Sequence, residues 1–307
     1  MVMGLKCSFC ERKAIINMRE HRLMLCEKHL IDFLRKRVEK TIIKYKLMTK
    51  NDNILVAVSG GKDSLGVWDI LNALGYHTEG LYINLGIDKY SRISKEKVER
   101  FAASRGLTVH EVDIPKAIGT STPMAAKAWK RSICSVCGMI KRYWMNRYAK
   151  ENGFTVVVTG HNLDDEIATL FGNNTTWQID YLQRQSIVLP ETHKKLVKKV
   201  KPLAFVTEKE SAAYAIARGI DYVYEECPYA KGATSIEFKY ILNLLENRFP
   251  GFKLRYYNGF LKNKKIFGDS HVKLNECQVC GFPTTLDTCN YCRLKKHISQ
   301  TAKSLTI

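Results

Sequence analysis

Residues 54–64 read Ile-Leu-Val-Ala-Val-Ser-Gly-Gly-Lys-Asp-Ser, and this stretch decides the fold. Residues that favour β-structure run from Ile54 to Val58 and enter a Ser-Gly-Gly turn. A helix is predicted next, because apolar residues recur at helical spacing at Leu65, Trp68, Leu71 and Leu74. The order is strand, glycine loop, helix.

The glycine loop predicts a phosphate site. Its adjacent glycines let the backbone approach an anion, and the N–H groups of the first helical turn point towards that anion. Ser59 and Ser64 add hydroxyl donors, Lys62 adds a positive charge, and Asp63 is expected to cap the helix or to help hold a metal. The spacing differs from the Walker pattern, which has four residues between its first glycine and the Gly-Lys pair. A ligand-free turn is the alternative, but the specific order of these residues favours the phosphate site.

Length and composition indicate a globular protein with satellite modules. The chain has 307 residues and 45% hydrophobic content, enough for one substantial core. No window approaches 18 uninterrupted apolar residues, and no apolar leader precedes Cys7. We therefore expect a cytoplasmic protein without a membrane segment.

The positive charge is concentrated at the two ends of the chain. Of the net charge of +19, residues 1–50 hold 13 Lys/Arg against 5 Asp/Glu, and residues 253–307 hold 10 against 3. Two basic ends on a nearly neutral middle favour contact with a polyanion such as nucleic acid. A generally lysine-rich surface is the alternative.

Two groups of four residues have the spacing of structural zinc sites. Each group consists of two pairs with two-residue gaps, and four ligands complete a tetrahedral set that leaves no position open for water. Unligated thiols are the alternative that this spacing disfavours. The first group is Cys7, Cys10, Cys26 and His29; the second is Cys277, Cys280, Cys289 and Cys292.

Further strands and helices alternate along the middle of the chain. Gly80–Ile83, Thr108–Val112 and Thr155–Val158 are predicted strands, and Lys95–Ser104 is a predicted helix. This alternation is typical of an α/β fold with a doubly wound parallel sheet, which binds ligands beyond the carboxyl ends of its strands. The basic run Lys194–Lys201 is predicted to be a loop.

We divide the chain into four parts on these patterns. They are an N-terminal zinc module (1–32), a connecting helix (33–50), a catalytic domain (51–252) and a C-terminal zinc module (253–307).

Three cysteines fall outside the zinc groups. Within the helical pattern of Met124–Lys150, Cys134, Cys137 and Lys141 share one stripe because they lie at i, i+3 and i+7. Cys227 is the only other unassigned cysteine. Three thiols leave a four-coordinate site one ligand short, which suits an iron–sulfur cluster with one exchangeable iron or a catalytic persulfide pair. Three buried cysteines acting as small hydrophobes are the remaining alternative.

Two other patterns leave their role open. Adjacent carboxylates at Asp164–Glu166 follow a buried strand, and they either favour a helix dipole or hold Mg²⁺ beside a triphosphate. Aromatic residues among the lysines of the tail either stack on unstacked bases or form a small core. They are Tyr256, Tyr257, Phe260, Phe282 and Tyr291.

The combination of motifs resembles the TtuA/NcsA group of tRNA 2-thiouridine synthetases, in the TtcA family of PP-loop ATP pyrophosphatases. The resemblance covers nearly the whole chain: a zinc module at each end, Ser59–Ser64, Cys134–Gly138, Gly160–Asp165 and Glu226–Pro228. His29 stands where relatives that act on the wobble uridine often carry cysteine, so the likeness favours the branch that acts on position 54.

The resemblance implies a set of site residues and partners. It implies Lys141 and Asp165 as the catalytic pair, a [4Fe-4S] cluster on Cys134, Cys137 and Cys227, and two structural Zn²⁺. It also implies tRNA as the substrate, a ubiquitin-like sulfur carrier protein and a homodimer. ATP with Mg²⁺ is assigned to Ala57, Ser59, Gly60, Gly61, Lys62, Asp63, Ser64 and Gly160.

The expected reaction has two steps. The C2 oxygen of a uridine attacks the α-phosphorus of ATP, pyrophosphate leaves, and sulfur then replaces the adenylated oxygen while AMP departs. The alternatives are the same chemistry at uridine 34, a persulfide in place of the cluster, a ligase that passes ammonia to an adenylated carboxylate, and an RNA-binding scaffold gated by nucleotide.

Overall fold

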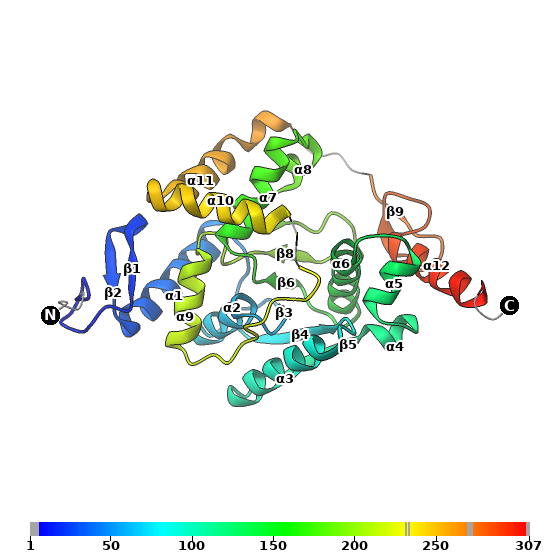
Figure 1. Cartoon of the computed structure of the whole chain (residues 1–307), viewed down its shortest axis with the longest axis horizontal. Helices are drawn as coiled ribbons and strands as arrows, with labels where there is room; N and C mark the ends of the chain where they lie inside the picture. The colour runs from blue at the N-terminus through cyan, green and yellow to red at the C-terminus, as the bar shows by residue number, and fades with distance from the viewer. Residues whose placement is uncertain (1–5, 231, 233, 269–272, 305–307) are drawn as a thin grey trace.

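The computed structural model describes residues 6–230, 232, 234–268 and 273–304, and a six-stranded sheet lies at its centre (Figure 1). Five strands are parallel, and only the edge strand β7 runs antiparallel to its neighbour. The strands follow in the order β5 (Val109–Asp113), β4 (Thr78–Asn84), β3 (Ile54–Val58), β6 (Val156–Thr159), β8 (Lys198–Val200) and β7 (Val188–Leu189).

The strand order creates a crevice at the carboxyl ends of β3 and β6. From β3 the chain winds outward through β4 and β5, and it then returns to the opposite side of β3 with β6. In open α/β sheets a ligand binds where the winding direction changes in this way. The predicted doubly wound parallel fold is confirmed, with β7 as an added antiparallel edge.

Alternation along the strands gives the sheet two apolar faces. Ile54, Val56 and Val58 point to one face and Leu55 to the other, and burying each such side chain contributes about 1.5–3 kcal/mol. The first face is covered by α1 (Glu27–Lys44), α2 (Lys62–Ala73), α3 (Asp88–Ser104), α7 (Leu163–Thr175) and α9 (Glu208–Ala217). The second is covered by α4 (Ile114–Ile118), α5 (Thr122–Ala128), α6 (Ile133–Glu151) and α12 (Asn290–Ser304).

The remaining helices pack around α7. It contacts α8 (Ile179–Arg184), α10 (Thr234–Arg248) and α11 (Phe252–Asn263), and a 3₁₀ turn, η2 (Lys264–Phe267), follows α11. Helices α10 and α11 thus belong to the central domain, and the C-terminal cysteine module begins after them. None of the described helices combines the length and the apolar run needed to span a bilayer.

The two small cysteine modules lie at opposite ends of the molecule, beside the N and C labels of Figure 1. The N-terminal module is a hairpin of β1 (Ile16–Met18) and β2 (Leu23–Leu25) joined by the 3₁₀ turn η1 (Arg19–His21). The C-terminal module contains β9 (Asn275–Glu276) and β10 (Pro283–Thr284), and its helix α12 packs against α5 and α6.

Three sequence predictions were wrong in their local structure. The run Lys194–Lys201 is not entirely loop, because Lys198–Val200 forms β8 with Val200 buried in the core. The pattern Met124–Lys150 is two helices, since Lys130 has a φ of 52° and Ser132 caps α6. Helix α3 begins at Asp88, seven residues before the predicted start at Lys95.

Burial favours the packing interpretation of the tail aromatics. Tyr257, Phe260 and Tyr291 are buried. Tyr256 stacks on Phe252 with ring centroids 5.8 Å apart. Phe282 is half-buried against a tyrosine of α6, and Tyr256 is half-buried as well, so these two members of the set retain some accessible surface.

Candidate active site and metal centres

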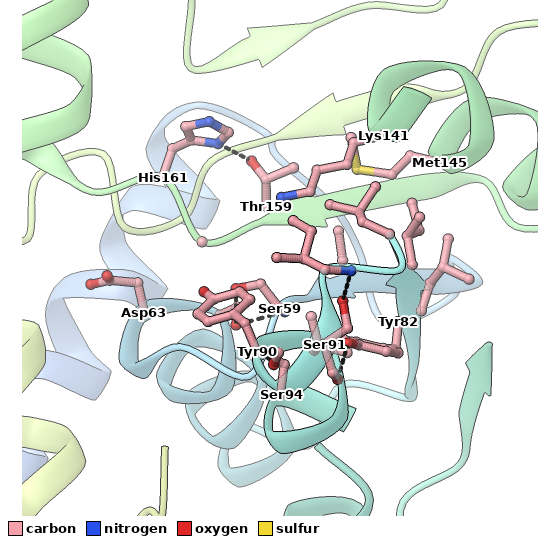
Figure 2. A pocket seen from close by; sticks show the side chains of 18 of the residues that line it. Ser59, Asp63, Tyr82, Tyr90, Ser91, Ser94, Lys141, Met145, Thr159 and His161 are labelled. Atoms are coloured by element: carbon pink, nitrogen blue, oxygen red, sulfur yellow. Dashed lines mark hydrogen bonds between the residues drawn. The ribbon is translucent and has the colours of Figure 1, made fainter. Parts of the chain in front are cut away.

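A cavity of about 390 Å³ lies at the carboxyl ends of β3 and β6 (Figure 2). Strand ends, the glycine loop, the start of α3 and one side of α6 form its wall. The predicted site residues in that wall are Ala57, Ser59, Asp63, Ser64, Lys141, Gly160 and Asp165. The structure therefore brings the predicted nucleotide loop and the predicted catalytic pair to one cavity.

The glycine loop needs glycine at Gly60. Its φ is +80°, and a Cβ there would lie 2.8 Å from the carbonyl oxygen of Ser94. Gly61 then caps α2, so that the first N–H groups of this helix face the loop. The hydroxyl of Ser64 accepts from the N–H of Ser59 at 3.1 Å and donates to the carbonyl of Gly61 at 3.0 Å. These bonds fix the loop as an open cradle for an anion.

The loop that follows β6, Gly160 to Asn162, packs against the glycine loop. A Cβ at Gly160 would lie 2.8 Å from the backbone nitrogen of Ser64, so only glycine allows the end of β6 to approach the start of α2 this closely. Asn162 then donates from Nδ2 to Oδ1 of Asp63 at 3.1 Å. The two loops are therefore one structural unit around the cavity.

Ion pairs that the sequence analysis missed surround the loop. Lys62 binds Glu208 at 2.8 Å and Asp63 at 3.2 Å, and Lys239 of α10 binds Asp165 at 2.6 Å and Glu208 at 3.1 Å. Burial acts to raise the pKa of Glu208, but Lys239 and Lys62 lower it to about 2. Glu208 is therefore an ionised counter-ion for both lysines. No local motif marks Glu208 or Lys239, because their partners are far away in the sequence.

The three adjacent carboxylates of α7 have different roles. Asp164 is buried against Lys253 and also accepts from the backbone N–H of Glu208 at 2.8 Å. Glu166 is buried and accepts from Tyr257 at 3.0 Å. Only Asp165 lines the cavity, and it also completes a capping box with Asn162. Asp164 and Glu166 are thus structural.

Asp63 and Asp165 could hold a divalent cation. Both line the cavity, and burial raises the pKa of Asp63, with the negative charge of Asp165 acting in the same direction. A cation bound beside Asp63 would offset the cost of its buried negative charge, and carboxylate oxygen suits Mg²⁺.

Lys141 links the cavity to the unassigned cysteines. It lies on α6, one turn after Cys137, and its side chain reaches into the cavity towards Thr159 in Figure 2. Burial raises the pKa of Cys137 to about 11, and the nearby Lys141 ammonium opposes this shift. The lysine is therefore close enough to act on both the thiol and a bound nucleotide.

The three unassigned cysteines lie together beside the cavity. Cys134 and Cys227 both contribute to the raised pKa of Cys137, and Cys227 acts in the same way on Tyr90, which lines the cavity. The Cys134 thiol donates to the carbonyl of Tyr229 at 3.3 Å. Cys134 is exposed, and the other two are half-buried. This arrangement contradicts the alternative of three cysteines buried as small hydrophobes.

The donor set of these three thiols suits a cluster. Among the described residues, they do not form a compact four-ligand group like the two predicted zinc groups. Iron–sulfur clusters are held by cysteine thiolates, and three of them leave one iron of a [4Fe-4S] cluster without a protein ligand.

The predicted zinc ligands form two compact groups. In the first, Cys7 Sγ lies 3.2 Å and Cys26 Sγ 3.5 Å from Nδ1 of His29. In the second, the sulfur atoms of Cys280 and Cys289 are 3.7 Å apart. All four ligand atoms of each group lie within 4.8 Å of one another, as one tetrahedral ion requires.

Backbone hydrogen bonds favour a thiolate at one cysteine of each compact group. Burial acts to raise the pKa of Cys7 and of Cys277, but hydrogen bonds from nearby backbone N–H groups lower each to about 6. Burial raises the pKa of Cys289 to about 11, so the thiols of a group do not all share this preference. Because the thiolate is the form that binds metal, the hydrogen bonds prepare Cys7 and Cys277 for zinc.

Two family models match the chain. Residues 6–31 match the N-terminal LIM domain of the 2-thiouridine synthetase TtuA, and residues 32–231 match the PP-loop domain.

Curated relatives are similar along nearly their whole length. A Thermus thermophilus protein named tRNA-5-methyluridine(54) 2-sulfurtransferase is 45% identical over 97% of this chain and 93% of its own. A Pyrococcus horikoshii protein of the same name is 44% identical over 96% of each chain.

One solved structure is similar in both fold and sequence. The U34-tRNA thiolase NcsA from Methanococcus maripaludis, solved with its [4Fe-4S] cluster, has a TM-score of 0.80 and 25% identity. The alignment covers 96% of this chain and 97% of that one.

Proposed function

This chain belongs to the TtuA/NcsA group of PP-loop tRNA 2-thiouridine synthetases, and we propose that it thiolates C2 of 5-methyluridine at position 54 of tRNA. The enzyme is a tRNA 2-sulfurtransferase that uses ATP. One observation carries the proposal for the site: the glycine loop, Lys141, Asp165 and the three unassigned thiols all adjoin one cavity.

Adenylation makes the uridine C2 carbon reactive. The C2 oxygen is a poor leaving group, so its attack on the α-phosphorus of ATP converts it into part of a phosphate ester, and pyrophosphate leaves. Residues Ser59–Ser64 would hold the departing pyrophosphate through backbone N–H groups and hydroxyls. Lys141 would stabilise charge on the α-phosphate, and Asp165 would accept the proton lost from the base or, with Asp63, bind Mg²⁺.

Sulfur then replaces the activated oxygen. When bound to three cysteines, a [4Fe-4S] cluster supplies one iron position at which hydrosulfide can be held. We assign this cluster to Cys134, Cys137 and Cys227. Hydrosulfide adds at C2, the C2–O bond breaks, and AMP leaves with the original oxygen. Because Lys141 lies one helical turn from Cys137, both steps can share one cavity.

The two compact ligand groups are proposed to be structural zinc sites. One Zn²⁺ would bind Cys7, Cys10, Cys26 and His29, and the second would bind Cys277, Cys280, Cys289 and Cys292. We further propose that a ubiquitin-like carrier ending in a Gly-Gly thiocarboxylate delivers the sulfur, and that the enzyme works as a homodimer. Both partners follow from the family resemblance.

The decisive experiment uses the cluster-loaded protein, ATP, sulfide and tRNA under anaerobic conditions. Mass spectrometry of digested tRNA should show 5-methyl-2-thiouridine, and AMP and pyrophosphate should appear in equal amounts. A tRNA with cytidine at position 54 should remain unmodified, whereas cytidine at position 34 should have no effect.

Two alternatives are tested in the same assay. Modification at uridine 34 is favoured by the likeness to the Methanococcus maripaludis enzyme, and the opposite pattern of tRNA variants would support it. A persulfide mechanism would proceed in protein without iron and acid-labile sulfide when a low-molecular-weight persulfide replaces sulfide as the sulfur donor, because sulfide alone cannot form a persulfide without an oxidant. Activity in such iron-free protein would exclude the cluster.

A further inference from the structure

A second cavity, of about 230 Å³, lies between α6 and the C-terminal cysteine module. Arg142 and Asn146 of α6 lie on one side, and Phe282 and Thr284 of the module lie on the other. Arg142 directly follows Lys141, and successive residues of an α-helix are turned by about 100°. The second cavity is therefore next to the catalytic cavity, on a neighbouring side of the same helix.

Asn146 presents an unused acceptor in this cavity. The residue is 3% exposed, and its Nδ2 donates to the backbone carbonyl of Arg142 at 2.8 Å. Its Oδ1 has no hydrogen-bond partner among the described residues. Because a buried acceptor without a donor is costly, the position favours a ligand that brings an N–H group.

Two cations without a carboxylate partner lie near each other, and one of them, Arg142, lines the cavity. Among the described residues, neither Arg142 nor Lys199 of β8 forms an ion pair. Burial, assisted by the neighbouring charge of Arg142, lowers the pKa of Lys199 to about 8. Arg142 therefore has free N–H donors for a carbonyl or a phosphate of a ligand.

Aromatic rings line one side of the cavity, and half-buried Phe282 is the most accessible of them. Tyr143 of α6 stacks on Tyr291 with ring centroids 4.0 Å apart, Phe282 lies 4.6 Å from Tyr143, and all three rings line the cavity. Aromatic planes beside a guanidinium are the usual surroundings of an unstacked nucleobase. The cavity is smaller than the roughly 300–1,000 Å³ of pockets for drug-sized ligands, which suits a single base.

We propose that this cavity binds one unstacked base of the tRNA, beside the uridine held in the catalytic cavity. The inference rests on the proposed function, because tRNA is its ligand. Asn146 accepts and Arg142 donates, so the complementary base edge carries an N–H beside a carbonyl, as uracil and guanine do. A phosphate alone offers no N–H for Asn146, and an acidic side chain offers none either.

The experiment measures tRNA binding by the full-length, cluster-loaded protein without ATP at a fixed salt concentration. A set of tRNAs carries one abasic nucleotide each, at uracil or guanine positions around the modified uridine. Wild-type protein should lose about 10-fold in affinity at one position besides the target, the size of one lost base contact. Arg142→Ala and Asn146→Leu should lose about 10-fold for intact tRNA and should no longer distinguish that abasic tRNA.

Controls distinguish the loss of a base contact from misfolding and from a loss of contacts to the RNA backbone. Arg100→Ala, on α3 against the opposite face of the sheet, should bind every tRNA as wild type does. Zinc content and ATP affinity should be unchanged in the cavity variants. The proposal is overturned if both variants bind all tRNAs as wild type does, if they weaken every tRNA equally, or if they lose only sulfur transfer from a carrier protein.

The same experiments distinguish failure of the proposed base site from failure of the proposed reaction. If wild-type protein binds tRNA with the expected abasic pattern but never thiolates it, the base site stands and the reaction is wrong. If it thiolates tRNA while the variants are indistinguishable from wild type, the reaction stands and the base site is wrong.

Discussion

Replacing Lys253 by methionine separates the structural role of Asp164 from the chemical role proposed for Asp165. Lys253 and Asp164 are 3% and 2% exposed, and the ammonium of Lys253 also contacts Oδ1 of Asn243 at 2.5 Å. Lys253→Met removes the cation and leaves the carboxylate buried with only the Glu208 N–H as a partner. Breaking a buried pair in this way costs about 3–5 kcal/mol of the free energy of unfolding.

Thermal and urea unfolding measure this loss. At roughly 1.6 °C per kcal/mol for a chain of 307 residues, the melting temperature should fall by about 5–8 °C. Asp164→Asn in the Lys253→Met background should recover part of the loss, because it removes the unpaired charge and retains an oxygen for the Glu208 N–H. Lys262→Met is the matched control: this exposed lysine of the same helix should change the free energy of unfolding by less than about 0.5 kcal/mol. A Lys253→Met protein as stable as this control would refute the reasoning.

Three further predictions concern the active site. Asp165→Asn and Lys141→Ala should each lower kcat for thiolation by about 10²–10⁴-fold while tRNA still binds; unchanged turnover would exclude them as the catalytic pair. Gly60→Ala should weaken ATP binding at least about 10-fold in calorimetry, because its Cβ would meet the carbonyl of Ser94 and its φ of +80° disfavours alanine, and wild-type affinity would contradict the cradle. Each serine substitution of an unassigned cysteine should remove the visible absorption of the reconstituted cluster and leave two zinc ions per chain; a variant with a full iron complement is not consistent with that residue as a ligand. These cysteines are Cys134, Cys137 and Cys227.

Local patterns were sufficient for the elements with short-range signals. The strand Ile54–Val58, its glycine loop and the compact zinc groups follow from residue spacing alone, because each depends on neighbours in the sequence. The i, i+3, i+7 spacing on α6 likewise predicted that Cys134, Cys137 and Lys141 share one face of the helix. The closeness of Cys227 to them came from counting unassigned thiols, a weaker argument that the structure supports.

The features that the sequence analysis missed depend on contacts between residues far apart in the chain. Strand β8 was missed because Lys198 and Lys199 read as a solvated run, although Val200 is buried in the core. Glu208 and Lys239 meet around the glycine loop from separate helices, and no motif marks either residue. The cavity beside Asn146 forms where the C-terminal module docks on α6, which spacing along one helix cannot predict.

Helix α6 fixes the distance between the catalytic cavity and the second cavity. Rising about 1.5 Å per residue, it holds Lys141 and Asn146 about 7.5 Å apart along its axis, and no hinge intervenes between them. A substitution therefore changes the side chain at one of these positions, but it does not change the separation between them. One inserted residue after Cys137 would turn every later side chain by about 100° and misalign both cavities with the thiols at once.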